Sequence, residues 1–120
     1  MSHEPPRAVH APLAGDAGGQ VAQLRHVLGL VETMAGLPAS ADGDGRMDEA
    51  ARLSAAYADA LPIDRRRFDA LASETAAWAA SGVETLLHLE EEQLPAAAAA
   101  SRLARELAFA VDRLKATLRA

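Results

Sequence analysis

The sequence predicts an all-α protein: a small bundle of three to five amphipathic helices behind a disordered N-terminal tail. Apolar residues recur three and four positions apart along most of the chain, which is the spacing of one helix face. Proline and glycine interrupt this pattern where helices are expected to end, and no segment has the character of a strand. A chain of 120 residues suits a single domain, which we place at residues 20–120, with residues 1–19 as the tail.

The composition limits the classes of function. Hydrophobic residues make up 50% of the chain but aromatic residues only 3%, so the core is expected to rest on leucine, valine and alanine. A net charge of −5 argues against nucleic-acid binding, which needs a basic surface. The absence of cysteine excludes disulfides and thiolate metal sites. No apolar run is long enough to span a membrane and no secretory signal is visible, so we expect a cytoplasmic protein.

The first helix is expected over residues 20–37. The tail before it holds His3 and His10, which we interpret as solvated side chains rather than metal ligands. Asp16 suits the approach to the helix, whereas Gly36 and Pro38 suit its end. The predicted apolar stripe is Val21, Leu24, Leu28, Val31 and Ala35, widened by Val27, Leu30 and Met34.

A loop over residues 38–45 is followed by a second predicted helix over residues 46–60. The loop resembles a calcium-binding loop only in part: if Asp42 were the first ligand, the twelfth position would be Leu53, which cannot bind calcium. Asp48 and Glu49 are expected in the helix's first turn, where acidic groups suit the dipole. The expected apolar face consists of Met47, Ala50, Ala51, Leu53, Tyr57 and Leu61.

The segment from Pro62 to Glu92 is predicted to be the central helix, with Asp64 as its cap. We expect the helix to continue through Gly82, because the apolar pattern keeps its phase there, although a new helix could also begin at that point. Trp78 is predicted to be largely buried. The expected apolar and adjoining positions are Phe68, Leu71, Thr75, Trp78, Ala79, Val83, Leu86 and Leu87.

The last helix is expected within residues 93–120, with Pro95 in its first turn. Arg113, Lys115 and Arg119 suit the negative end of its dipole. Its predicted stripe is Leu103, Leu107, Ala110, Val111, Leu114 and Leu118, and Phe109 falls off this stripe.

Two polar clusters invite a functional interpretation. Arg65, Arg66 and Arg67 could dock an acidic partner, but consecutive helical residues point in different directions, so we interpret them as a solvated helix start. Glu84, His88 and Glu92 are four residues apart and align on one face, a pattern similar to that of di-iron bundles. Those sites draw ligands from several helices, and we therefore favour an outward polar face.

His26 carries the alternative hypothesis of phosphotransfer. Its setting on the outer face of a bundle helix resembles that of histidine phosphotransfer proteins, which place a small residue one turn away. That family usually has a lysine three residues on and a glycine four residues on, whereas this chain has Gly29 and Leu30 there. The departure puts the phosphoryl-stabilising group in doubt.

No assembled catalytic motif appears, so the favoured function is a non-catalytic helical module that binds another protein as a regulator, adaptor or self-assembling subunit. The alternatives are a phosphotransfer bundle using His26 and, more weakly, a metal-binding bundle. No cofactor is implied. We also expect a homodimer that covers the secondary apolar faces around Leu30 and Phe109, unless these two faces meet within one chain.

Overall fold

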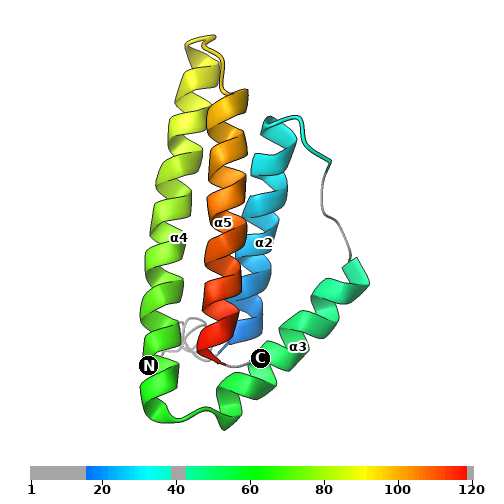
Figure 1. Ribbon diagram of the computed structural model, residues 1–120, viewed down its shortest axis with the longest axis vertical. Helices are drawn as coiled ribbons and strands as arrows, with labels where there is room; N and C mark the ends of the chain where they lie inside the picture. Colours follow the sequence, from blue (N-terminus) through cyan, green and yellow to red (C-terminus); the bar gives the residue numbers. More distant parts are fainter. Residues whose placement is uncertain (1–15, 39–42, 119–120) are drawn as a thin grey trace, which may run out of the picture.

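The computed structural model describes residues 16–38 and 43–118, which form helices α2 (Ala17–Met34), α3 (Gly43–Asp59), α4 (Pro62–Glu91) and α5 (Ala97–Thr117). Helices α2, α4 and α5 run lengthwise, with α5 between the other two, whereas α3 leaves the bundle at an angle (Figure 1). The described residues contain no strand. The predicted all-α fold is confirmed.

The core lies where α2, α4 and α5 pack against one another. The predicted stripe of α2 is buried from Val21 to Val31, and that of α5 is buried except for Ala110, which is half-buried. Burial of leucine and valine supplies most of the stabilisation in a chain with so few aromatic residues, at about 1.5–3 kcal/mol for each buried side chain. The largest fully buried side chains are Phe68, Leu53, Leu86, Leu107, Leu114, Val21, Val31 and Val111.

Helix α2 begins three residues earlier than predicted, because Asp16 caps it. The Asp16 carboxylate accepts a hydrogen bond from the Gly19 amide at 2.9 Å. At the other end Gly36 has φ 76°, and the Leu37 amide donates to the Glu32 carbonyl at 2.9 Å. This is a Schellman termination, so Gly36 ends the helix as predicted. Residues 17–19 therefore belong to the bundle, and residues 1–15 of the predicted tail lie outside the described residues.

Gly18 lets α2 approach α3 closely. A Cβ atom at this position would lie 2.1 Å from the carbonyl oxygen of Ala50, so only glycine fits. The Gly18 amide also donates to the Ser54 hydroxyl at 3.1 Å. The contact between α2 and α3 thus depends on one small residue and one hydrogen bond to its backbone.

Few of the described side chains of helix α3 are buried against the bundle. The prediction of its apolar face is therefore wrong for much of that face. Leu53 is fully buried, but Met47 is 74% exposed and Leu61 is 64% exposed. The helix begins at Gly43 rather than residue 46, and its principal contact is with α2. It runs at a slant to the bundle (Figure 1), and Ala56 and Tyr57 near its C-terminal end pack against the core.

Helix α4 is continuous through Gly82, as predicted. A Cβ atom on Gly82 would lie 2.8 Å from a methyl group of Leu103, so glycine makes room for the α5 core. The predicted cap Asp64 is wrong: Leu61 occupies the cap position with no side-chain hydrogen bond, and Asp64 lies in the first turn.

The prediction that Trp78 is largely buried is also wrong, because its side chain is 40% exposed. The buried residues of α4 are Phe68, Ala72, Thr75, Ala79 and Leu86. Four of them, Phe68, Thr75, Ala79 and Leu86, belong to the predicted stripe, and Ala72 is added to it. The larger Leu71, Trp78 and Leu87 fall on the flanks of the buried stripe. A cost of 3–5 kcal/mol for Trp78→Ala, which full burial would imply, is therefore not expected.

The connection from α4 to α5 spans residues 92–96. Gln93 has φ 58°, and the Leu94 amide donates to the Leu89 carbonyl at 2.8 Å, which terminates α4 in the same way as α2 but without glycine. Pro95 lies in this connection, before α5 begins at Ala97, so its predicted place in the first helical turn is wrong.

Candidate functional site

A polar cluster in the interior surrounds Glu49 and joins α2, α3 and α5. The Arg25 guanidinium donates to both carboxylate oxygens, from Nε at 2.6 Å and from Nη2 at 2.8 Å. The Lys115 Nζ donates to Oε2 at 2.7 Å. Hydrogen bonding by Arg25 and then Lys115, against the opposing effect of burial, lowers the pKa of Glu49 to about 2.

This cluster is structural. Both oxygens of the Glu49 carboxylate are occupied by cations of the chain itself, and the residue is only 9% exposed. The prediction that Glu49 and Lys115 serve mainly the helix dipoles missed these contacts. The sequence did hold a signal, because Glu49 precedes the buried Leu53 by one helical turn and therefore shares its inward face.

A second polar cluster fixes the corner between α3 and α4. The Tyr57 hydroxyl lies 2.9 Å from Oδ2 of Asp69, to which it donates. Arg65 donates to the carbonyl oxygens of Tyr57 at 3.0 Å and Ala58 at 2.8 Å, which satisfies the end of α3. Burial first, and then the bond to Asp69, raise the pKa of Tyr57.

The contacts of the corner cluster separate the three consecutive arginines, Arg65, Arg66 and Arg67. Arg65 is engaged with the end of α3, whereas Arg66 is exposed and Arg67 reaches Asp64 only at 3.9 Å. The three side chains do not form one basic patch. The interpretation as a helix start with partial ion pairing fits these contacts better than an acidic docking site.

The other residues that were weighed as metal ligands and lie in the described part of the chain do not form a metal site. Glu84, His88 and Glu92 are exposed, and Glu92 lies beyond the last residue of α4. Within residues 16–38 and 43–118 no three histidine, aspartate or glutamate side chains are placed to hold a metal ion. His3, His10 and Asp42 lie outside the described residues.

His26 is exposed on α2, as the phosphotransfer hypothesis requires. A Cβ atom on Gly29 would meet nothing within 4 Å, so the surface one turn away is open. The outward position of His26 agrees with the sequence prediction; phosphorylation itself stays a prediction.

A hollow of ≈ 580 Å³ lies between α2 and α4, but its carboxylates are already engaged. Asp16 caps α2, and Asp69 accepts from Tyr57. The remaining polar side chains of its lining include Gln23 and Ser73, and the wall contains Leu24 and several small residues. This lining offers no nucleophile paired with a base.

The groove between α4 and α5 differs because large side chains remain uncovered there. Trp78 is 40% exposed and Phe109 is 65% exposed, and both line a hollow of ≈ 260 Å³. An adjoining hollow of ≈ 300 Å³ continues the groove past Trp78 and Glu106 towards the start of α5. The residues that define this α4/α5 face are Leu71, Glu74, Trp78, Arg102, Glu106, Phe109 and Arg113.

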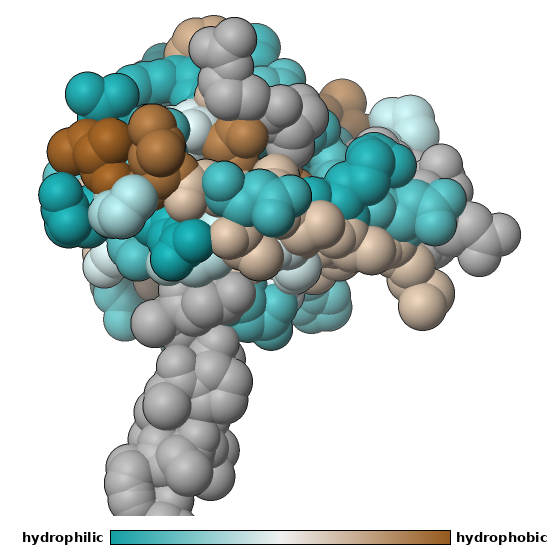
Figure 2. Space-filling view, turned by 90° about the horizontal axis from the view of Figure 1, so that it is seen from below, coloured by the Kyte–Doolittle hydropathy of each residue, from teal (hydrophilic) through white to brown (hydrophobic). Residues whose placement is uncertain are grey.

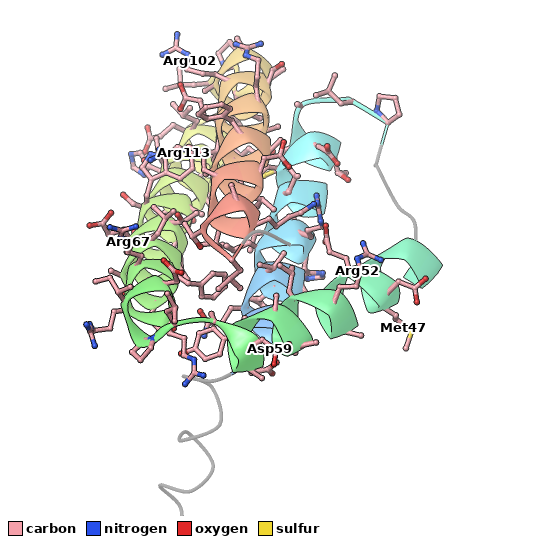
Figure 3. The ribbon with its side chains drawn as sticks, turned by 60° about the horizontal axis from the view of Figure 1, so that its bottom comes forward. Met47, Arg52, Asp59, Arg67, Arg102 and Arg113 are labelled. Carbon is pink, nitrogen blue, oxygen red and sulfur yellow. The ribbon has the colours of Figure 1, made fainter. Side chains whose placement is uncertain are left out.

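Charged residues of both signs frame these aromatic side chains. Arg102, Glu106 and Arg113 follow one stripe of α5, because intervals of four and seven residues return to nearly the same side of a helix. In Figure 3 the labelled Arg102 and Arg113 project on the same side of α5 as α4. Glu74 adds a carboxylate from α4. The face is therefore apolar at its centre and charged along its borders.

Phe109 does not share this groove with α2. The hollow around it is lined by α4 and α5 alone, while Leu30 on α2 is 51% exposed. The exposed apolar face around Phe109 is therefore formed together with α4, and it does not meet the face around Leu30 within this groove.

A smaller apolar group lies at the corner where α3 meets α4. Leu61 is 64% exposed and Ile63 is 45% exposed. Seen from below in Figure 2, hydrophobic side chains gather on the α4 side of the molecule. Unlike the α4/α5 face, neither Leu61 nor Ile63 lines one of the hollows described above.

Comparison with protein-family models, with curated proteins and with solved structures found no match for this chain. None of the helices in the described part of the chain combines the length and apolar character needed to cross a bilayer.

Proposed function

We propose that this chain is a non-catalytic protein-interaction module that binds its partner through the α4/α5 face. The observation that carries the proposal is the exposure of Trp78 and Phe109 along one groove, at 40% and 65%. Aromatic side chains that sit in a groove with a charged rim are the usual anchors of protein interfaces.

The cost of leaving these side chains in water supports the proposal. The chain has two phenylalanines, one tryptophan and one tyrosine. Phe68 is fully buried and Tyr57 packs against it with ring centroids 5.8 Å apart, whereas Trp78 and Phe109 remain at the surface. Covering exposed apolar area contributes about 25 cal/mol per Å², which a partner would gain here.

Photo-crosslinking from position 109 tests this proposal. Benzoylphenylalanine in place of Phe109 is close to the native side chain in shape, and in place of Met47 it provides a control at an exposed site on α3. In cells of the source organism we expect protein adducts from position 109 that are absent from position 47. Equal adduct patterns from both positions would contradict the proposal.

A second candidate function uses His26. The proposal of phosphotransfer is supported by the exposure of His26 and by the open surface at Gly29, which would admit a receiver domain. The chain is incubated with a phosphorylated receiver domain, and His26→Gln is the control. Phosphoryl transfer to the native chain alone would support this function, and no transfer to either would remove it.

The proposed location of this module is the cytoplasm, which remains a prediction from the sequence.

A further inference from the structure

We propose that the partner of the α4/α5 face is a second copy of this chain, related by a two-fold axis that crosses α5 beside Phe109. This inference rests on the proposed function, because it names the partner of the same face. It is carried by the charge pattern of α5, which matches itself when the helix direction is reversed.

The matching charges are Glu106 and Arg113. They are seven residues apart, so they lie on one side of α5 about 10 Å apart along its axis, with Phe109 between them. Both are exposed and both line the groove that holds Phe109. The order along the helix is therefore acidic, aromatic, basic.

A two-fold axis between Phe109 and Ala110 brings opposite charges together twice. With the two α5 helices antiparallel, Glu106 of each copy faces Arg113 of the other copy. The two Phe109 side chains then lie side by side at the centre and cover each other. Symmetric pairing of one patch with itself is the commonest way in which identical chains associate.

A one-residue shift of register loses this match. In one direction it places Glu106 opposite Asp112 and Arg105 opposite Arg113, which are like charges. In the other direction Glu106 faces the buried Leu114. The charge pattern therefore favours a single arrangement as well as a partner.

Trp78 extends the contact from α4. It lines both hollows together with Glu106. In the proposed dimer Arg113 of the second copy approaches Glu106 and therefore the indole beside it. A guanidinium over an indole ring adds a favourable cation–π contact, so the dimer covers both exposed aromatic side chains of the face.

Charge reversal tests this arrangement in the full chain by sedimentation over a range of micromolar concentrations. Glu106→Arg and Arg113→Glu each place like charges together and are expected to weaken dimerisation at least about tenfold. The double variant restores opposite charges in exchanged positions and is expected to return to within a few-fold of the native chain. Glu90→Arg with Arg52→Glu, at exposed sites elsewhere, is the matched control.

Helicity by circular dichroism is measured for each variant, and Glu106→Gln replaces Glu106→Arg if the latter unfolds. A strictly monomeric native chain, or a dimer unaffected by the single reversals, would overturn the inference. Single reversals that weaken the dimer without rescue in the double variant would also overturn it. A monomer that still forms adducts with a different protein from position 109 would leave the proposed function standing, whereas no adducts would remove both.

Discussion

The junction around Glu49 and the α4/α5 face are both built between helices, but they treat charge and apolar area in opposite ways. At the junction, Glu49 is inside, with Arg25 and Lys115 within 2.8 Å of its oxygens. At the face, charged side chains stand outside and two aromatic side chains remain in water. The difference separates the polar residues that hold the fold together from the surface that we propose binds a partner.

The largest expected difference in stability between the core and the α4/α5 face concerns the two phenylalanines. Phe68 is fully buried and Phe109 is 65% exposed. Phe68→Ala is expected to lower the free energy of unfolding by about 3–5 kcal/mol, because it leaves a cavity in the core. Phe109→Ala is expected to change it by less than about 0.5 kcal/mol at concentrations where the chain is monomeric.

Denaturant unfolding of both variants in dilute protein measures this difference. Similar losses from the two substitutions would mean that Phe109 belongs to the core, and the contrast would fail.

Two glycines of α2 allow the same comparison between a packed and an open position. Gly18 lies in the contact with α3, whereas Gly29 faces open space. Gly18→Ala places a methyl group against the Ala50 carbonyl, where only 2.1 Å is available, and is expected to cost about 2–3 kcal/mol. Gly29→Ala places the same methyl group in open space and is expected to stabilise α2 by about 0.5–1 kcal/mol. Melting midpoints that move in the same direction would contradict the close approach at Gly18.

The contribution of Glu49 to the stability of the fold is expected to depend on pH. Its pKa is about 2 in the folded chain against an ordinary value of 4.5, so its contribution to stability is present above pH 4.5 and is lost as the pH falls towards 2. Glu49→Gln leaves Arg25 and Lys115 without their acceptor and is expected to cost about 2–3 kcal/mol at neutral pH.

Unfolding curves measured between pH 7 and about 2 check the prediction, with Glu90→Gln as the control at an exposed carboxylate. The cost of Glu49→Gln should shrink as the pH falls through this window. A cost that is independent of pH would mean that the carboxylate charge is not the source of the stabilisation.

Local sequence patterns predicted the helices but not their rotation against one another. The buried stripes of α2 and α5 were predicted almost residue by residue, because in each helix leucine and valine recur three and four positions apart along one face. Helix α4 carries large apolar residues on two sides, and the sequence alone placed Trp78 and Leu71 on the inward side with Ala79 and did not include Ala72. In the structure Ala72 and Ala79 are both buried, whereas Trp78 is exposed and Leu71 is only half-buried.

The candidate site was hidden for the same reason. A groove between α4 and α5 depends on how far α4 is turned, which apolar spacing along one helix does not determine. Phe109 could be recognised as lying off its stripe, but its neighbour Trp78 could not. Glu49 was missed because an acidic residue near a helix start has an ordinary explanation in the helix dipole.

The accessibility of Trp78 is the most direct test of whether a second copy covers the α4/α5 face. It is the sole tryptophan of the chain, so its fluorescence reports this groove alone. Quenching by acrylamide is expected to be strong in dilute native protein and to weaken as the concentration rises into the dimeric range. In Phe109→Glu it should stay strong throughout. Quenching of native Trp78 that does not change with concentration would contradict the proposed dimer.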